Sequence, residues 1–592
     1  MLELSPSAQQ ILVLTVTFLV VLALFWERIK PSVIFFGAVI CFLLAGVVPT
    51  EALLESFSNE SILSIFLLIF ITAAVNDHFN LLGGLDRLFG NARSPRAFTL
   101  RMTSGVALIS SVMNNTPIVA LMIPYVYRWA KKRGLHPSRF LIPLSYAAIV
   151  GGMITVIGTS TNLVLNGLIA SKGDPILEWD DFLWLGLLVT VAGVLFLYFI
   201  GYRLLPDRAD VLEELNEQTR EYLVETRVPP GSSLVGQSIA SASLRNLKGI
   251  YLFEIARKGQ VINPVAPEEQ LCENDSLFFA GDTENVIELI RDGNGLMLPT
   301  AASQREPLSN VVEMVVPANS LLIGHTLKEL NFREDYDAAV IAIHRNGEKL
   351  HGKIGEIYIK AGDLMLLSAG RNFDKRVNQN RILYPVSVVQ KVQESSPWQR
   401  RWFIFLFLLF MGLVLGGLLD LFTGLLLVTS ALVLLGLLGI ADLKRHLDVE
   451  LLIILASSLT FSRALIDSGA AVMVAEGVTS FFGMWGDFGV LTGLFVLTLV
   501  LTSFVTHVAA VSVVFPIAYA MCHGMGVDPT PYYVGVAFAA SASFHAPFSY
   551  QTNLMVYGPG GYKFKDFLKI GIPFTLIYSV ICIVFIMWYY GF

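Results

Sequence analysis

Two groups of small polar residues interrupt long apolar stretches, and each group occurs once in either half of the chain. Asn115 lies nine residues before Pro124, and His507 lies nine residues before Pro516. The first group consists of Asn114, Asn115, Thr116, Thr506 and His507. The second group follows 40 to 50 residues later in each half and consists of Gly158, Thr159, Ser160, Thr161, Asn162, Gln551, Thr552 and Asn553. The matched spacing indicates an internal repeat.

These residue types indicate a site for an ion and an anion. Irregular backbone at membrane depth is tolerated only where it is buried or lines a cavity. Gly158 is followed by four hydroxyl or amide residues, which favour turns over a continuous helix, so we expect a broken helix here. Freed carbonyls and side-chain oxygens suit Na⁺, and helix N-termini offer N–H groups to an anion. We therefore expect Na⁺ near Asn115 and Gly158.

The polar groups allow two other interpretations, a purely structural role and a site for a divalent metal. Asn and Thr also form ordinary hydrogen bonds between membrane helices, which would give them a structural role alone. A divalent metal would need clustered carboxylates, and Asp and Glu do not cluster in these segments. The repetition of both groups at matched spacing favours a binding site.

The composition indicates a membrane protein with a soluble insert. Only 15% of the 592 residues are charged, whereas about 25% is usual for soluble chains. Long apolar runs fill 10–204 and 402–591, and the stretch between them has an ordinary soluble composition. One helix needs about 20 apolar residues to cross a bilayer, so both flanks are expected to cross several times. The net charge of −6 gives no nucleic-acid signal, and the four scattered cysteines indicate no disulfide framework.

The distribution of basic residues predicts the topology. Lys and Arg near the ends of spans remain in the cytoplasm. Basic clusters lie near 28–30, 128–139, 203–208, 400–401 and 563–569, and the intervening turns are nearly free of them. This alternation places 205–399 in the cytoplasm and both termini outside, with the protein in the plasma (inner) membrane. The first run has no basic residues before it, so we interpret it as a span and not as a signal peptide.

The fold expected from this pattern is an all-α polytopic membrane protein with a cytoplasmic α+β tandem domain. Each membrane half, 1–204 and 400–592, contains five spans and one re-entrant hairpin, and the two halves have opposite orientation. The first hairpin, 99–130, opens to the cytoplasm, and the second, 489–525, opens to the outside. The ten expected spans are 11–27, 33–48, 61–77, 140–170, 182–204, 402–418, 423–440, 449–466, 531–558 and 571–590.

The polar groups resemble those of the divalent anion:sodium symporter family, in particular its sulfate-permease-like branch. The resemblance lies in 114–116, 157–162 and the string Tyr550 to Tyr562. It implies a homodimer, a scaffold and a moving transport unit in each protomer, and elevator-type movement. It also implies that the substrate and Na⁺ are held between the hairpin tips and the broken helices, near Ala546 and Pro547 in the second half.

The second hairpin tip departs from the family pattern, which has hydroxyl and amide residues in both halves. Here Thr506 is followed by His507 and Val508, and valine has no side-chain oxygen. A second Na⁺ site near His507 is therefore in doubt. A neutral His507 could bind the anion, a protonated one could replace a cation, and a buried neutral one could be purely structural.

The soluble insert is itself a repeat with an offset of 88 residues. Val228-Pro229 and Leu234-Val235-Gly236 match Val316-Pro317 and Leu322-Ile323-Gly324, and alternating apolar strands follow in each copy. The two copies, 218–300 and 304–388, resemble the TrkA C-terminal (RCK C-terminal type) domain. That resemblance implies dimerisation and binding of a small regulatory ligand such as a nucleotide.

We therefore predict a secondary transporter, and not an enzyme, that imports a small divalent anion together with Na⁺. Sulfate is favoured over a dicarboxylate by the resemblance alone. The expected partners are the anionic substrate, membrane lipid and a second copy of the chain. Proton coupling and ion-driven export remain alternatives. A potassium channel would need a Thr-Val-Gly-Tyr-Gly-type filter, which the sequence lacks.

Overall fold

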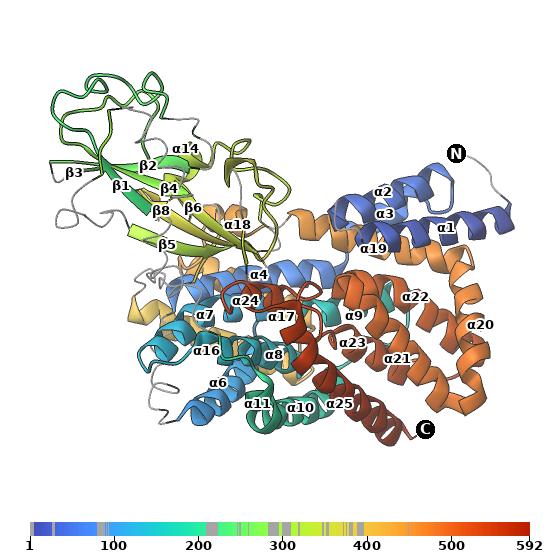
Figure 1. Cartoon of the computed structure of the whole chain (residues 1–592). Helices are drawn as coiled ribbons and strands as arrows, with labels where there is room; N and C mark the ends of the chain where they lie inside the picture. The colour runs from blue at the N-terminus through green and yellow to red at the C-terminus, as the bar shows by residue number, and fades with distance from the viewer. Residues whose placement is uncertain are drawn as a thin grey trace.

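Figure 1 shows a computed structural model of the chain, in which many helices pack together and the strands of the insert gather on one side of them. The structure describes most residues from Ser5 to Gly591. The longer stretches outside the description are 80–88, 209–222, 282–294, 299–309 and 387–395, and shorter gaps fall elsewhere. The expected domain boundaries near 218, 300, 304 and 388 lie in or next to these stretches.

The first half is helical, and its helices begin where proline or a capping side chain permits. Proline occupies the first turn of α2 and α6, where its missing N–H has no cost. The Asn59 side chain accepts hydrogen bonds from the first turn of α4. The helices are α1 (Pro6–Phe25), α2 (Pro31–Leu44), α3 (Thr50–Phe57), α4 (Glu60–His78), α6 (Pro95–Ser110), α7 (Asn115–Lys131), α8 (Leu141–Gly152), α9 (Ser160–Ser171), α10 (Trp179–Phe196) and α11 (Tyr202–Leu204).

The second half repeats this order. Its helices are α16 (Pro397–Leu415), α17 (Leu421–Leu434), α18 (Ile440–His446), α19 (Val449–Asp467), α20 (Ala470–Phe482), α21 (Gly486–Phe504), α22 (His507–Met525), α23 (Thr530–Ala540), α24 (Gln551–Tyr557) and α25 (Phe564–Tyr590). The packing follows a pseudo-twofold relation. Helix α2 packs against α19 and α17 against α4, while α9 packs against α22 and α24 against α7.

Helix lengths agree only in part with the ten expected spans. Within the described residues, seven helical stretches are long and apolar enough to cross a membrane. The expected spans 33–48 and 423–440 form the 14-residue helices α2 and α17. The expected spans 140–170 and 531–558 are each two helices separated by irregular backbone. Helix α20 was not expected, because its 13 residues are too few for a span.

Both broken helices are held by a close-packed glycine on a neighbouring helix. A Cβ at Gly186 of α10 would lie 2.5 Å from the Met153 carbonyl oxygen in the first break. A Cβ at Gly571 of α25 would lie 2.6 Å from the Phe544 carbonyl oxygen in the second. Only glycine allows this approach, so the same device supports the break in each half.

The insert contains two sheets of the same topology. The first has the order β1-β4-β2-β3 and the second β9-β5-β8-β6-β7. The strands are β1 (Leu223–Arg227), β2 (Ile250–Arg257), β3 (Gln260–Ile262), β4 (Ser276–Gly281), β5 (Asn310–Val315), β6 (Ala338–Arg345), β7 (Glu348–Lys349), β8 (Leu364–Ala369) and β9 (Tyr384–Pro385), with the short helix α14 (Phe332–Tyr336). A register shift occurs at 252–254 in β2 and at 340–342 in β6, so the expected 88-residue repeat is present in the structure.

One ion pair recurs in both sheets. Arg257 contacts Asp275, and Arg345 contacts Asp363, with Nε–Oδ1 distances of 2.9 and 2.7 Å. Both aspartates are fully buried, and a buried carboxylate needs such a partner. Each guanidinium also donates to a backbone carbonyl of the turn that precedes β4 or β8, so it fixes the conformation of that turn.

Replacing Gly571 by alanine should destabilise the protein, because the new Cβ would meet backbone that cannot move aside. Overpacking of this kind costs about 1–3 kcal/mol. We expect the midpoint of thermal denaturation in detergent to fall by several degrees. Gly477→Ala in α20 is the matched control, since its Cβ would meet nothing within 4 Å. Equal midpoints for the two variants would contradict the proposed role of Gly571.

Candidate functional site

The tips of the two hairpins are formed by capped helix N-termini. Helix α7 begins at Asn115, and the Asn114 side chain accepts from the Thr116 N–H. Helix α22 begins at His507, and the Thr506 side chain accepts from the Ala509 N–H at 3.4 Å. Short polar side chains of this kind accept hydrogen bonds from N–H groups of the first helical turn and so stabilise the start of the helix. The caps place Asn115 and His507 at equivalent positions of the two tips.

The Tyr550 side chain joins the two tips. Its ring stacks on the His507 ring with a centroid separation of 4.6 Å. Its hydroxyl lies 3.1 Å from the Asn115 amide and 3.3 Å from the Thr159 hydroxyl. The Asn115 amide is best satisfied with its oxygen toward Tyr550 and its nitrogen toward the carbonyl oxygens of Ala148 and Gly158. A single side chain therefore contacts both tips and the first break.

The first break is packed tightly around Asn115. A Cβ at Gly152 would lie 2.6 Å from the Asn115 side-chain amide, and one at Gly158 would lie 2.5 Å from the Gly152 carbonyl oxygen. The Thr155 hydroxyl accepts from the Gly158 N–H at 3.2 Å. The two glycines thus bring hairpin tip and broken helix together, with Thr159 and Thr161 buried and Ser160 half-buried beside them.

Asn162 has an unused oxygen in this region. Its amide nitrogen donates to the Thr155 carbonyl oxygen at 3.1 Å. Its Oδ1 is buried and has no hydrogen-bond partner among the described residues. A buried acceptor without a partner is costly, and a cation or a donor at this position would satisfy the atom.

In the second break, both the oxygen and the nitrogen of the Asn553 amide have hydrogen-bond partners. The Ser145 hydroxyl of α8 lies 2.7 Å from Asn553 Oδ1 and 2.9 Å from the Thr552 hydroxyl. The Asn553 nitrogen lies 3.4 Å from the Ala546 carbonyl oxygen. Pro547 follows in the same buried irregular segment. At the tip of the first hairpin, the Thr116 hydroxyl donates to Gln551 Oε1 at 3.0 Å.

The difference between the breaks follows from one substitution in the repeat. The repeat offset is 392 residues, because the Ser110 hydroxyl donates to Ala148 and the Thr502 hydroxyl donates to Ala540. At this offset the position equivalent to Ser145 is Ala537. Ala537 has no hydroxyl, so the side chain that would satisfy Asn162 Oδ1 is missing. We infer that the first half keeps the free oxygen and the second half does not.

His507 also has an atom without a partner. Its Nδ1 is buried and makes no hydrogen bond among the described residues. The ring is half-buried against Tyr550, and Val508 is buried beside it. The second tip therefore offers a ring nitrogen where the first tip offers an amide.

Of the residues singled out in the sequence, Tyr550 contacts Asn115, Thr159 and His507, and the Asn115 amide reaches the Gly158 carbonyl oxygen. It links Thr116 to Gln551, while Asn162 lies in the first break and Thr552 and Asn553 in the second. Four further residues of this region, Tyr550, Ser145, Ser110 and Thr155, were not predicted to contribute to the site. The repeat could have indicated Ser110, because Thr502 at the matched position is also a hydroxyl residue in an apolar helix.

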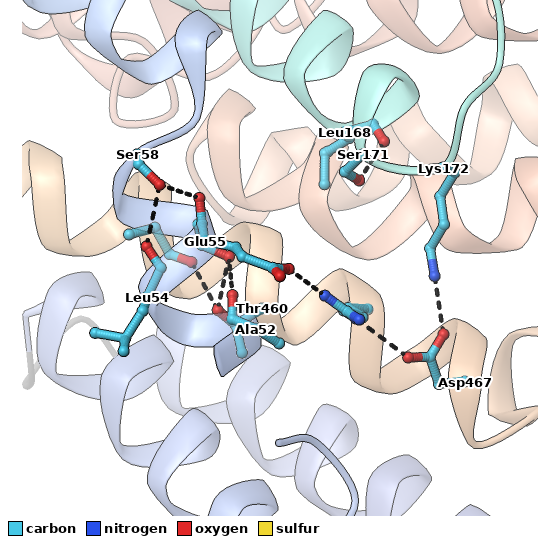
Figure 2. Close-up of polar contacts among 12 residues, drawn as sticks. Ala52, Leu54, Glu55, Ser58, Leu168, Ser171, Lys172, Thr460 and Asp467 are labelled. Carbon is cyan, nitrogen blue, oxygen red and sulfur yellow. Dashed lines mark hydrogen bonds and ion pairs between the residues drawn. The ribbon is translucent and has the colours of Figure 1, made fainter. Parts of the chain in front are cut away.

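Charged residues near the predicted outer ends of spans form an ion-pair network and not a site. Arg463 of α19 pairs with Glu55 at 2.9 Å and Asp467 at 3.4 Å. Asp467 also pairs with Lys172, which follows α9, at 2.9 Å. Figure 2 shows Glu55, Asp467 and Lys172 along this line of contacts. The network fastens the far end of α9, whose other end carries Ser160.

The chain is similar to known proteins over nearly its whole length. The CitMHS family profile, described as citrate transporter, matches residues 21–425 and 405–592. A protein of Chlamydomonas reinhardtii named as a sulfur deprivation response regulator is 32% identical, over 94% of this chain and 97% of its own length. An uncharacterized transporter of Synechocystis is 31% identical, over 97% and 95%.

A relative with a named substrate is more distant. Sodium/sulfate cotransporter 1 of Chlamydomonas reinhardtii is 22% identical, over 96% of this chain and 88% of its own length. The family profile covers both helical halves, in which the repeated polar groups and the apolar helices lie. The chain is a multi-pass membrane protein and belongs to the CitMHS citrate transporter family.

Proposed function

We propose that this protein is a secondary active transporter that imports a small divalent anion together with Na⁺. Sulfate is the favoured anion and a dicarboxylate is the alternative substrate. The observation that carries the proposal is the Oδ1 of Asn162 in the first break, which is buried and has no hydrogen-bond partner among the described residues. The name of the sodium/sulfate cotransporter among its relatives supports the choice of ion and anion.

The Na⁺ site that we propose lies near Asn115 and Gly158. Its ligands would be oxygens of the first break, including Asn162 Oδ1. Such neutral oxygens suit a monovalent cation, whereas a divalent cation prefers carboxylates. No group of three or more His, Cys, Asp or Glu side chains that could hold a metal occurs in the described part of the chain. A second Na⁺ site near His507 would lack the oxygen that the first tip provides.

The anion would bind where the N-termini of long helices face the junction. Helices α7, α9 and α22 begin at Asn115, Ser160 and His507. Each N-terminus offers free N–H groups and partial positive charge. Thr116, Thr506, Gln551 and Thr552 would add hydrogen bonds. This arrangement binds a dianion without a lysine or arginine in the site.

The remaining parts of the proposal concern movement and assembly. Hairpins α6–α7 and α21–α22, with α8, α9, α23 and α24, would form the unit that moves by an elevator-type mechanism within a homodimer. The two helical halves would lie in the inner membrane of the cell. The insert, 205–399, would lie in the cytoplasm. There its two TrkA-C-like copies would regulate transport, with a nucleotide as one candidate ligand.

Proton coupling is the second candidate function, because His507 Nδ1 is buried and makes no hydrogen bond in the part of the chain that the structure describes. A histidine at this position could carry a proton in place of a second Na⁺. Ion-driven export by the same site is the other alternative. The driving gradient and the direction of net flux separate these three cases.

Uptake into proteoliposomes tests the proposal. We expect an inward Na⁺ gradient to drive accumulation of labelled sulfate above the level without a gradient, with succinate and citrate as the competing anions. A proton gradient alone should drive little uptake. Accumulation driven only by protons would support the alternative, and no movement of any of the three anions would refute the proposed substrate class.

Asn162→Ala should weaken Na⁺ dependence, because it removes the free oxygen. We expect the Na⁺ concentration for half-maximal uptake to rise by about five-fold or more, which corresponds to about 1 kcal/mol. Asn166→Ala, one turn later in α9, is the matched control. Both amide atoms of Asn166 bond to the Leu177 backbone, so this variant should lose stability and keep its Na⁺ dependence. The same Na⁺ dependence in both variants would remove Asn162 from the site.

Tyr550→Phe should impair transport, because it removes the hydroxyl at the junction and keeps the ring that stacks on His507. Loss of a hydrogen bond costs about 0.5–1.5 kcal/mol, so we expect sulfate uptake to fall by about two- to twelve-fold. Tyr578→Phe is the control, since its buried hydroxyl bonds to the Phe538 carbonyl oxygen at 3.1 Å and to the Cys582 side chain, and neither partner belongs to the junction. Equal uptake by the two variants, at matched thermal stability, would contradict the role of Tyr550.

A further inference from the structure

The second sheet of the insert touches the helix that carries Thr552 and Asn553. A Cβ at Gly558, just after α24, would lie 2.7 Å from the Gly362 carbonyl oxygen. A Cβ at Gly362, in the turn before β8, would lie 2.7 Å from the Leu554 side chain. Two backbones therefore approach closely, and both positions along the contact are glycine.

Two ion pairs fix the part of the chain that follows α24. Lys563, in the connection between α24 and α25, pairs with Glu348 of β7 at 3.2 Å. Arg208, at the entry to the insert, pairs with Asp566 at 2.8 Å and donates to the Gly561 carbonyl oxygen at 3.0 Å. The connection 558–566 is thus contacted by the linker, by the turn at Gly362 and by the hairpin β6–β7.

The insert repeat differs at the contact position itself. At the 88-residue offset, Gly362 corresponds to Asn274, and both have left-handed backbone, with φ of 81° and 65°. Their N–H groups donate to equivalent carbonyls, Val316 and Val228, both at 2.8 Å. Asn274 is exposed, whereas Gly362 is buried. Asparagine tolerates this backbone, so the glycine in the second copy is explained by the contact with α24 and not by the turn alone.

The contacted helix leads directly to the candidate site. Leu554 follows Asn553 in α24, whose seven residues begin at Gln551. The turn beyond α24 is also bonded to the first half, since Tyr127 donates to the Pro559 carbonyl and Tyr562 to the Ser138 carbonyl. A helix this short has little stability of its own, so its position depends on these surrounding contacts.

We propose that the turn 360–363 is a docking element through which the insert holds α24 in place and thereby sets the affinity of the anion site. The transport consequence rests on the function proposed above. The docked turn favours the position of α24 in which Thr552 and Asn553 contact Ser145. A ligand that displaces the insert lowers anion affinity, and by linkage the bound anion favours docking.

Gly362→Asn tests this inference, because it copies the residue of the first repeat into the docked position. The left-handed backbone is kept, while a side chain is added where Leu554 lies. Gly324→Asn is the matched control: Gly324 has a φ of 81° and nothing within 4 Å of its Cβ position. Both variants are to be measured in the full chain in detergent and in proteoliposomes.

We expect Gly362→Asn to increase hydrogen exchange in α24 and in the turn 360–363, and to raise the KM for sulfate by about five-fold or more, as coupling between sites commonly does. Gly324→Asn should leave both values within about two-fold of the original chain. Unchanged exchange in α24 overturns the docking role. Increased exchange with an unchanged KM overturns its effect on the site.

A second pair of variants keeps the inference testable if Gly362→Asn does not fold. Lys563→Glu should raise exchange in α24 by about two-fold, since exposed ion pairs are weak, and the added Glu348→Lys change should restore it. Absence of restoration counts against docking. If the original chain transports no sulfate, the proposed function fails, and the exchange measurements still decide whether the insert holds α24.

Discussion

The site that we propose depends on the hydroxyl of Tyr550, which contacts both the Asn115 tip and the first broken helix. Its ring also covers His507 of the opposite tip. Polar groups inside a membrane protein are stable only when they are paired. The close approach of the two halves at this residue pairs the Asn115 amide and the Thr159 hydroxyl, whereas Asn162 Oδ1 has no partner among the described residues.

The two halves are not an exact repeat, and the proposed function rests on the positions at which they differ. The two halves share their helix order, their broken helices and the close-packed glycines, Gly186 and Gly571. They differ at Asn115 and His507, and at Ser145 and Ala537. The first difference places an amide at one tip and an imidazole at the other. The second leaves an acceptor free in one half only. In the insert, the two copies likewise differ at Asn274 and Gly362, and Gly362 contacts α24.

Much of the helical framework could be predicted from the sequence, because apolar runs, matched prolines and the Gly158–Asn162 string have clear physical consequences. The 88-residue repeat likewise predicted two similar sheets. The sequence did not indicate Tyr550 or Ser145 as site residues, because a tyrosine or a serine in an apolar helix has several ordinary structural uses. It also missed α20, whose length falls below that of a span. Contacts between the insert and α24 depend on tertiary packing, which periodicity does not encode.

The most direct test is cryo-electron microscopy of the full chain in lipid nanodiscs, with sodium sulfate and with choline chloride. The account predicts density bounded by Asn115, Gly158, Asn162 and Tyr550 that is present only with sodium sulfate. It also predicts that the two hairpin tips remain in contact through Tyr550. Density for the ion and the anion elsewhere in the protein, or hairpin tips separated by lipid, would contradict it.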